Sequence, residues 1–188
     1  GSSISFKSTS AGNTVAFSGH SSNRSIYFNG VGGEWTMQDS LVQTNFLNEL
    51  NISNGTINTN GNTIKTGSFI VNGTATVNMS NSILSFLWKA EISSSNFNCG
   101  TSKVYVNTAV AAGIVTYINS SFDLYDVINE RPSSGSFELR GSGNYNKITQ
   151  NSPINTLVLK GTTADSIIVE SGTTLRLDGT VTVNDYLE

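Results

Sequence analysis

Two short passages of this chain recur at the same interval. The sequence ISNGT at residues 52–56 recurs with one change as IVNGT at residues 70–74. The sequence LVLKGT at residues 157–162 returns as LRLDGT at residues 175–180, and both offsets are 18 residues. A fixed period of about 20 residues predicts a solenoid, in which each repeat buries its apolar face only by stacking on its neighbours. No other feature constrains the fold as strongly.

Short apolar runs alternate with Gly and Asn along most of the chain, which predicts strands joined by tight turns. Residues 35–50 have partly helix-like apolar spacing, but Asn and Thr interrupt the run and favour strand. The predicted strands include residues 4–6, 15–17, 26–28, 103–106, 115–118, 122–125, 167–169, 175–177 and 181–183.

The repeat has a direct physical interpretation. Three short strands and three turns use about 18 residues, which is one coil of a β-helix whose successive coils pair as parallel strands. Leu157 and Leu159 recur as leucines one coil later, whereas Val158 between them is replaced by Arg176. Inward positions would be kept apolar in this way while outward ones vary. We therefore predict an all-β fold, a parallel β-helix with coils of about 18–20 residues.

The length of 188 residues fits a single domain spanning residues 1–188. Residues 129–136 form the best candidate for a corner loop. The period is poorest over residues 107–155, where an inserted functional loop stays an alternative. The opening Gly1-Ser2-Ser3 is typical of a cleaved tag, so we expect a fragment of a larger repetitive protein.

Composition and charge exclude several partners. Hydrophobic residues make up 37% and charged residues 12%, with a net charge of -3. The basic residues are scattered, so nucleic acid is not an expected partner. The apolar runs are too short to insert into a membrane. A surface rich in Ser, Thr, Asn and Gly favours an extracellular or cell-surface location.

Two segments carry a family resemblance, IYFNGVGGEWT at residues 26–36 and GTTLRLDGTVTV at residues 172–183. They resemble repeats of large secreted bacterial and phage proteins that contain pectin-lyase-like right-handed parallel β-helices. The resemblance covers residues 25–80 and 155–188, and it implies right-handed coils and an extracellular setting. The hexapeptide pattern of left-handed β-helices is not evident in the sequence.

Polysaccharide hydrolases and lyases share that fold, so we searched for their chemistry. Asp123, Asp126 and Glu130 lie close in sequence beside Arg131. They could form an acid/base pair or a calcium site, but solvated charges near a loop are the favoured interpretation. The Gly-His-Gly of polygalacturonases is not matched, because His20 lies in Gly-His-Ser. We expect no catalytic residue, metal or cofactor.

The remaining single residues have simpler interpretations. His20 is expected to be an exposed turn residue and Cys99 a small core residue, because neither has partners for a triad or a metal site. Trp35 and Trp88 are expected in the core or at a packed end.

Three tyrosines are spaced by 20 residues, Tyr105, Tyr125 and Tyr145. With coils of that length they would stack on one outer face and offer a platform for sugar rings. Chance spacing or sideways packing is the alternative. We predict Tyr105, Asp123, Tyr125 and Tyr145 as ligand-binding residues.

The sequence thus favours a non-catalytic stalk, adhesion or receptor-binding segment of a bacterial surface or phage fibre protein. Its expected partners are extracellular or cell-surface polysaccharides, together with flanking coils or further copies stacked on the solenoid ends. The alternative is a fragment of a carbohydrate-active enzyme, either a polysaccharide lyase or a hydrolase.

Overall fold

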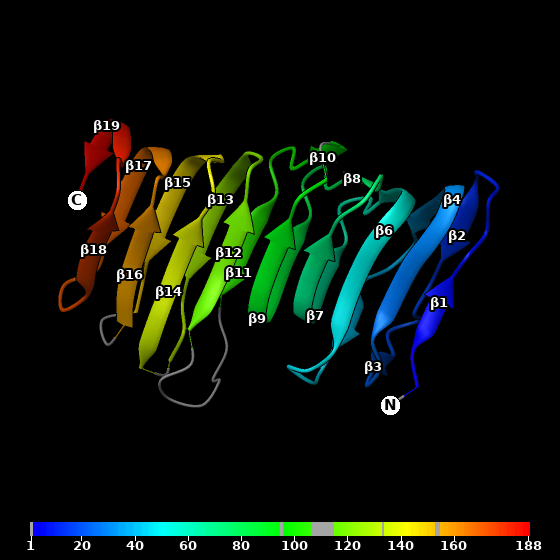
Figure 1. Cartoon of the computed structure of the whole chain (residues 1–188). Coiled ribbons are helices and arrows are strands. Elements are labelled where there is room, and N and C mark those ends of the chain that lie inside the picture. Colours follow the sequence, from blue (N-terminus) through cyan, green and yellow to red (C-terminus); the bar gives the residue numbers. More distant parts are fainter. Residues whose placement is uncertain (1, 95, 107–114, 133, 153–154) are drawn as a thin grey trace.

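The computed structural model describes residues 2–94, 96–106, 115–132, 134–152 and 155–188. The chain is a parallel β-solenoid of about 8 turns with coils of ~20 residues, and its two termini lie at opposite ends of an elongated body (Figure 1). All strand pairs between described residues are parallel, so the predicted fold is confirmed. The right-handed winding stays a prediction.

The strands stack into three ladders, and several long strands bend to join two of them. The first ladder is made of β1 (Ile4–Phe6), β4 (Ile26–Met37), β6 (Glu49–Asn58), β7 (Thr63–Val71), β9 (Ile83–Ile92), β12 (Thr116–Ser120), β14 (Gly135–Arg140), β16 (Asn155–Lys160) and β18 (Thr174–Asp178). The second consists of β2 (Asn13–Val15), β4, β6, β8 (Thr76–Asn78) and β10 (Asn96–Asn98).

The third ladder runs the length of the molecule. It is made of β3 (Ser21–Ser22), β5 (Leu41–Gln43), β7, β9, β11 (Lys103–Val106), β13 (Leu124–Asn129), β15 (Asn144–Gln150), β17 (Thr163–Val169) and β19 (Thr182–Leu187).

Alternating apolar residues create these strands and the core between them. In β11, for example, Val104 and Val106 are buried and Tyr105 points outward. Equivalent inward positions of successive coils then stack in columns. One column of the first ladder consists of Leu50, Phe69, Ala90, Ile118, Leu139 and Leu159.

The second ladder stops at β10 within the described part of the chain. Beyond it, the chain passes from the first ladder to the third through turns at residues 121–123 and 141–143. Among the described residues, the coils of the N-terminal half are therefore three-sided, and those of the C-terminal half have two strands each. We call this change from three-sided to two-stranded coils the step, and the candidate site lies beside it.

The two sequence repeats differ in how they match the structure. In the C-terminal repeat Leu157 pairs with Leu175, so the 18-residue offset seen in the sequence is the structural register. In the N-terminal repeat the same offset is wrong by one residue, because Ile52 pairs with Val71 rather than Ile70. Ile52 and Val71 both point into the core, at 0% exposure, and the inward side chain determines the register.

Three further expectations can be compared with the fold. Residues 35–50 contain strand and turn, as predicted, and the described residues contain no helix. The candidate loop at residues 129–136 reduces to the connection between β13 and β14, of which Ser133 lies outside the described residues. Residues 116–150 continue the ladders as β12 to β15. Residues 107–114, part of the suspected insertion, lie outside the described residues.

Candidate functional site

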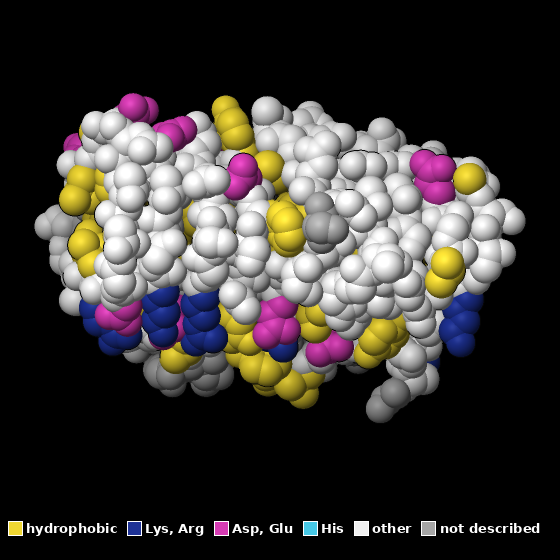
Figure 2. Space-filling view, turned by 45° about the horizontal axis from the view of Figure 1, so that its top comes forward, with side chains coloured by type: hydrophobic (Ala, Val, Ile, Leu, Met, Phe, Trp, Pro, Cys, Tyr) yellow, Lys and Arg dark blue, Asp and Glu magenta, His cyan; other side chains and the backbone are white. Residues whose placement is uncertain are grey.

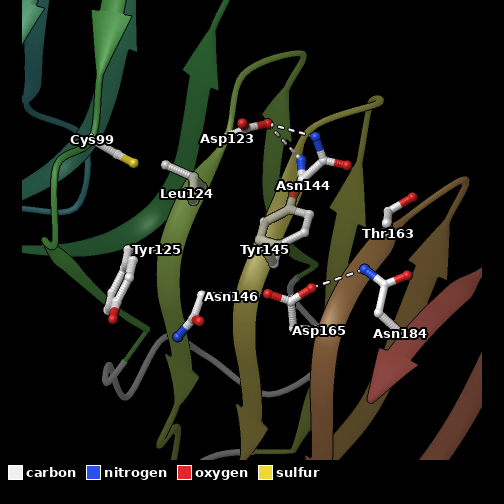
Figure 3. Close-up of a pocket in the computed structure, with 10 residues that line it drawn as sticks. All are labelled: Cys99, Asp123, Leu124, Tyr125, Asn144, Tyr145, Asn146, Thr163, Asp165 and Asn184. Atoms are coloured by element: carbon white, nitrogen blue, oxygen red, sulfur yellow. Dashed lines mark hydrogen bonds between the residues drawn. The ribbon is translucent and has the colours of Figure 1, made fainter. Parts of the chain in front are cut away.

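A hollow of about 410 Å³ lies where the third ladder begins in the C-terminal coils. It is formed by the first residues of β13, β15, β17 and β19, and Cys99 closes one end (Figure 3). Cys99 directly follows β10, the last strand of the second ladder. The hollow therefore sits at the step where the coils change from three sides to two.

Two outward columns of polar side chains border the hollow. The first contains Asp123, Asn144 and Thr163, and Asn144 and Thr163 are register partners. The second begins with the exposed Tyr125 and continues through Asn146, Asp165 and Asn184. Strand alternation places these side chains outside, as we predicted for Asp123 and Tyr125.

Hydrogen bonds between coils hold both carboxylates of the hollow. Asp123 Oδ1 accepts from the backbone N of Asn144 at 3.1 Å and from its Nδ2 at 2.9 Å. Asp165 Oδ1 accepts from Asn184 Nδ2 at 2.8 Å (Figure 3). Each carboxylate has a second oxygen that can accept from a ligand hydroxyl. Such fixed acceptors beside an aromatic ring are suited to a sugar.

The predicted ladder of three tyrosines on one outer face is wrong. Tyr105 pairs with Ile128, does not line the hollow, and lies on another column of the third ladder. Tyr145 pairs with Leu124 and points into the core at 2% exposure, so it contributes only the floor of the hollow. Register partners are 23 residues apart between β11 and β13 (Tyr105 and Ile128) and 21 residues apart between β13 and β15 (Leu124 and Tyr145), so a spacing of 20 residues leaves the three tyrosines out of register.

Burial determines the chemistry of the two protic groups near Asp123. Burial raises the pKa of the Tyr145 phenol, and the charge of Asp123 raises it further. The pKa of the half-buried Cys99 thiol is also raised, first by burial and then by Asp123. Both groups therefore stay protonated at neutral pH. Neither is suited to act as a nucleophile or general base.

The hollow continues toward β10. A neighbouring hollow of about 340 Å³ shares Cys99 and Asp123 with it and adds Phe97, Asn98, Ser121 and Phe122. Together they form a groove along the solenoid axis, in the space left by the missing third side. Successive coils are spaced by about 4.8 Å, so the groove presents similar polar groups at regular intervals.

The acidic cluster suggested by sequence does not assemble. Asp126 Oδ1 accepts from Asn146 Nδ2 at 2.8 Å, and the exposed Glu130 follows the far end of β13. Arg131 is not a solvated charge, since it is 1% exposed, and its guanidinium donates to the Ser136 carbonyl at 3.1 Å. Its position beside charged residues suggested exposure, but the turn folds it into the core.

Most of the hollow's polar groups were not predicted. Asn144 and Asn146 flank Tyr145, so strand alternation could have revealed them once Tyr145 was placed inward. Asp165 and Asn184 lie in other coils, and only the coil register brings them into the same column as Tyr125. The positions of Asp165 and Asn184 along the sequence do not by themselves predict that they line the hollow.

Four of the ten basic residues lie on strands of the first ladder, namely Lys89, Arg140, Lys160 and Arg176. Figure 2 shows Lys and Arg side by side with acidic groups below the C-terminal coils. Glu138 Oε2 accepts from Arg140 and from Lys160, each at 2.8 Å, and Arg176 pairs with Asp178 at 2.9 Å. These opposite charges neutralise one another between and within coils, so we interpret this row of charged side chains as structural.

The single residues agree with most simple expectations. His20 is exposed beside a turn. Trp35 is in the core at 2% exposure, whereas Trp88 is half-buried with Lys89 Nζ 5.1 Å from its ring centroid.

In the described ranges, no three His, Cys, Asp or Glu side chains group to hold a metal ion. None of the described segments forms a helix able to cross a membrane.

Comparisons with protein families, curated proteins and solved structures found no match. The resemblance to bacterial and phage surface repeats therefore stays a prediction beyond the β-solenoid itself.

Proposed function

We propose that this chain is a non-catalytic segment of an extracellular or cell-surface protein, and that its solenoid presents a glycan-binding groove. The observation that carries the proposal is the hollow beside the change from three-sided to two-stranded coils, which is lined by the exposed Tyr125 ring and by two carboxylates held by hydrogen bonds, Asp123 and Asp165. Solenoids commonly use such extended surfaces for binding. The charge-poor, hydroxyl- and amide-rich composition supports the extracellular location.

The groove is suited to a linear polysaccharide lying along the solenoid axis. Tyr125 would contact the apolar face of one sugar ring, and Asp123 and Asp165 would accept from hydroxyl groups. The polar columns repeat coil by coil, so neighbouring sugar residues would meet similar groups. A stalk or receptor-binding segment of a bacterial surface or phage fibre protein would hold a glycan through such a groove.

The test is binding to a panel of bacterial and plant polysaccharides by the unmodified chain and two variants. We expect Tyr125→Ala to weaken binding about tenfold or more, because it removes the aromatic platform. Tyr105→Ala is the matched control, since Tyr105 also points outward on the third ladder but lies outside the hollow. Equal binding by both variants would refute the proposal.

A carbohydrate-active enzyme is the second candidate, and one observation favours it. Asp123 and Asp165 both line the hollow, and glycoside hydrolysis commonly uses two carboxylates. The same panel decides this point through release of reducing or unsaturated ends. Release that is lost in Asp123→Asn and in Asp165→Asn would identify an enzyme, whereas binding without release supports the non-catalytic proposal.

A further inference from the structure

The groove beside the step is acidic and has no basic residue in its walls. Asp123 and Asp165 line the main hollow, and no Lys, Arg or His is among the described residues that line either hollow. Neither carboxylate forms an ion pair with a described residue. Two uncompensated negative charges repel an anionic ligand and attract a cationic one.

Both carboxylates are fixed, and each offers one oxygen to a ligand. Asn144 donates to Oδ1 of Asp123 and Asn184 donates to Oδ1 of Asp165, whereas Oδ2 of each carboxylate accepts no hydrogen bond from a described residue. A side chain that is already held in place loses little freedom when a ligand binds. A hydrogen bond from an ammonium group to a carboxylate is charge-assisted and about twice as strong as one between neutral groups.

The positions of the two carboxylates indicate an extended ligand. Asp123 directly precedes β13 and Asp165 lies in β17, with β15 between these two strands. The carboxylates are therefore two coil spacings apart along the solenoid axis, about 10 Å. This separation is close to the length of two residues of an extended sugar chain, so one oligosaccharide can reach both carboxylates.

The floor between the carboxylates holds a polar group without a partner. Tyr145 is 2% exposed, its ring lies between Asp123 and Asp165 (Figure 3), and its phenol forms no hydrogen bond with a described residue. Burial raises the pKa of this phenol and the charge of Asp123 raises it further, so the group stays neutral. Its oxygen can accept from an ammonium N–H, and its proton can be donated to a sugar hydroxyl. A buried polar group without a partner is costly, and a ligand in the hollow would satisfy it.

The other walls favour a cationic sugar over a simple polyamine. Tyr125 is 37% exposed, and its ring offers apolar area to the C–H groups of a sugar and a π-face to a cation. Asn146 and Thr163 on the neighbouring strands add polar groups that can bind sugar hydroxyls. A polyamine has no hydroxyl groups for these side chains.

We propose that the groove selects glycans that carry free amino groups, with Asp123 and Asp165 accepting from the ammonium groups of an oligosaccharide that lies along the solenoid axis. This inference rests on the glycan-binding function proposed above and names the chemical class of its ligand. Glycans that carry carboxylate or sulfate groups are repelled by the same two charges.

The experiment compares a trisaccharide of glucosamine with its N-acetylated, neutral counterpart by calorimetry or NMR titration. At about pH 6 the amines are protonated and the aspartates are ionised. We expect the amine to bind about tenfold or more tightly than the neutral sugar, and added salt should weaken only the binding of the amine. Asp123→Asn and Asp165→Asn should each remove most of this preference, because they keep the acceptor for Asn144 or Asn184 and lose only the charge.

Asp126→Asn is the matched control, since Asp126 accepts from Asn146 Nδ2 at 2.8 Å in a similar way but does not line the hollow. Equal affinity for the two trisaccharides would overturn the inference, as would a loss in Asp126→Asn as large as that in Asp123→Asn. In either case, weaker binding of both sugars by Tyr125→Ala would leave the proposed function standing. Absence of binding by both trisaccharides would overturn this inference alone, because the polysaccharide panel tests the proposed function separately.

Discussion

At the scale of the residue, Gly67 shows how little room the coil corners leave. A Cβ at this position would lie 2.4 Å from the carbonyl oxygen of Asn48, 2.5 Å from that of Phe46 and 2.6 Å from that of Asn45. These are backbone atoms of the loop that joins β5 to β6, so they cannot move aside as a flexible side chain would. Glycine at this position therefore holds the loop against β7.

We expect Gly67→Ala to lower the free energy of unfolding by about 1–3 kcal/mol, as overpacking does. Urea denaturation measures the loss. Ser68→Ala is the control in the same strand, because the buried Ser68 hydroxyl has no hydrogen-bond partner among the described residues. Its removal should change stability by less than about 0.5 kcal/mol or increase it. A similar loss in both variants would contradict this account.

At the scale of the element, the outer face of the first ladder is held by charge as well as by backbone pairing. Tyr117 donates to Glu91 Oε1 at 2.6 Å, and the Arg140 guanidinium carbon lies 4.1 Å from the Tyr117 ring centroid. Arg140 and Lys160 both bind Glu138. This network links β9, β12, β14 and β16 side by side.

Glu138 makes this face sensitive to acid. Burial raises the pKa of Glu138, but the hydrogen bonds and charges of Lys160 and Arg140 outweigh it, so the pKa lies below its usual 4.5. A carboxyl with a lowered folded-state pKa contributes stability above its unfolded pKa and loses it as the pH falls through the folded value. The ladder should therefore weaken in acid.

We expect the unmodified chain to lose more unfolding free energy than Glu138→Gln between about pH 6 and about pH 3. Denaturation midpoints across this range measure the difference. Glu130→Gln is the control, because the exposed Glu130 forms no ion pair with a described residue. Parallel pH profiles for the unmodified chain and Glu138→Gln would show that the Glu138 contacts contribute nothing.

How far the sequence predicts these elements depends on coil length. Where two coils have equal corners, as between Leu157 and Leu175, the repeat gives both the fold and the register. Where one corner is longer than that of the neighbouring coil, residues at the expected spacing no longer face the same side. Tyr145, which was predicted on the outer platform, therefore lies in the core. The alternation within β13 was local, so the outward Asp123 and Tyr125 could be predicted.

At the scale of the whole molecule, each coil contacts only its neighbours, so we expect stability to be local. Leu159 is buried at 0% exposure between Leu139 and Leu177. Leu159→Ala should accelerate amide hydrogen exchange in β14, β16 and β18 and leave β4 and β6 unchanged. Leu50→Ala, the equivalent change near the N-terminus, should show the reverse. Uniform acceleration along the chain in either variant would indicate one cooperative unit instead.

The end of the second ladder at β10 has a mechanical consequence. A rod curves most readily where its cross-section is thinnest, so a sideways load concentrates curvature in the two-stranded coils and spares the three-sided ones. The junction between stiff and pliable halves is also where Tyr125 and Asp123 lie. Bending this molecule thus changes the spacing of the groups that border the groove before it disturbs the N-terminal coils.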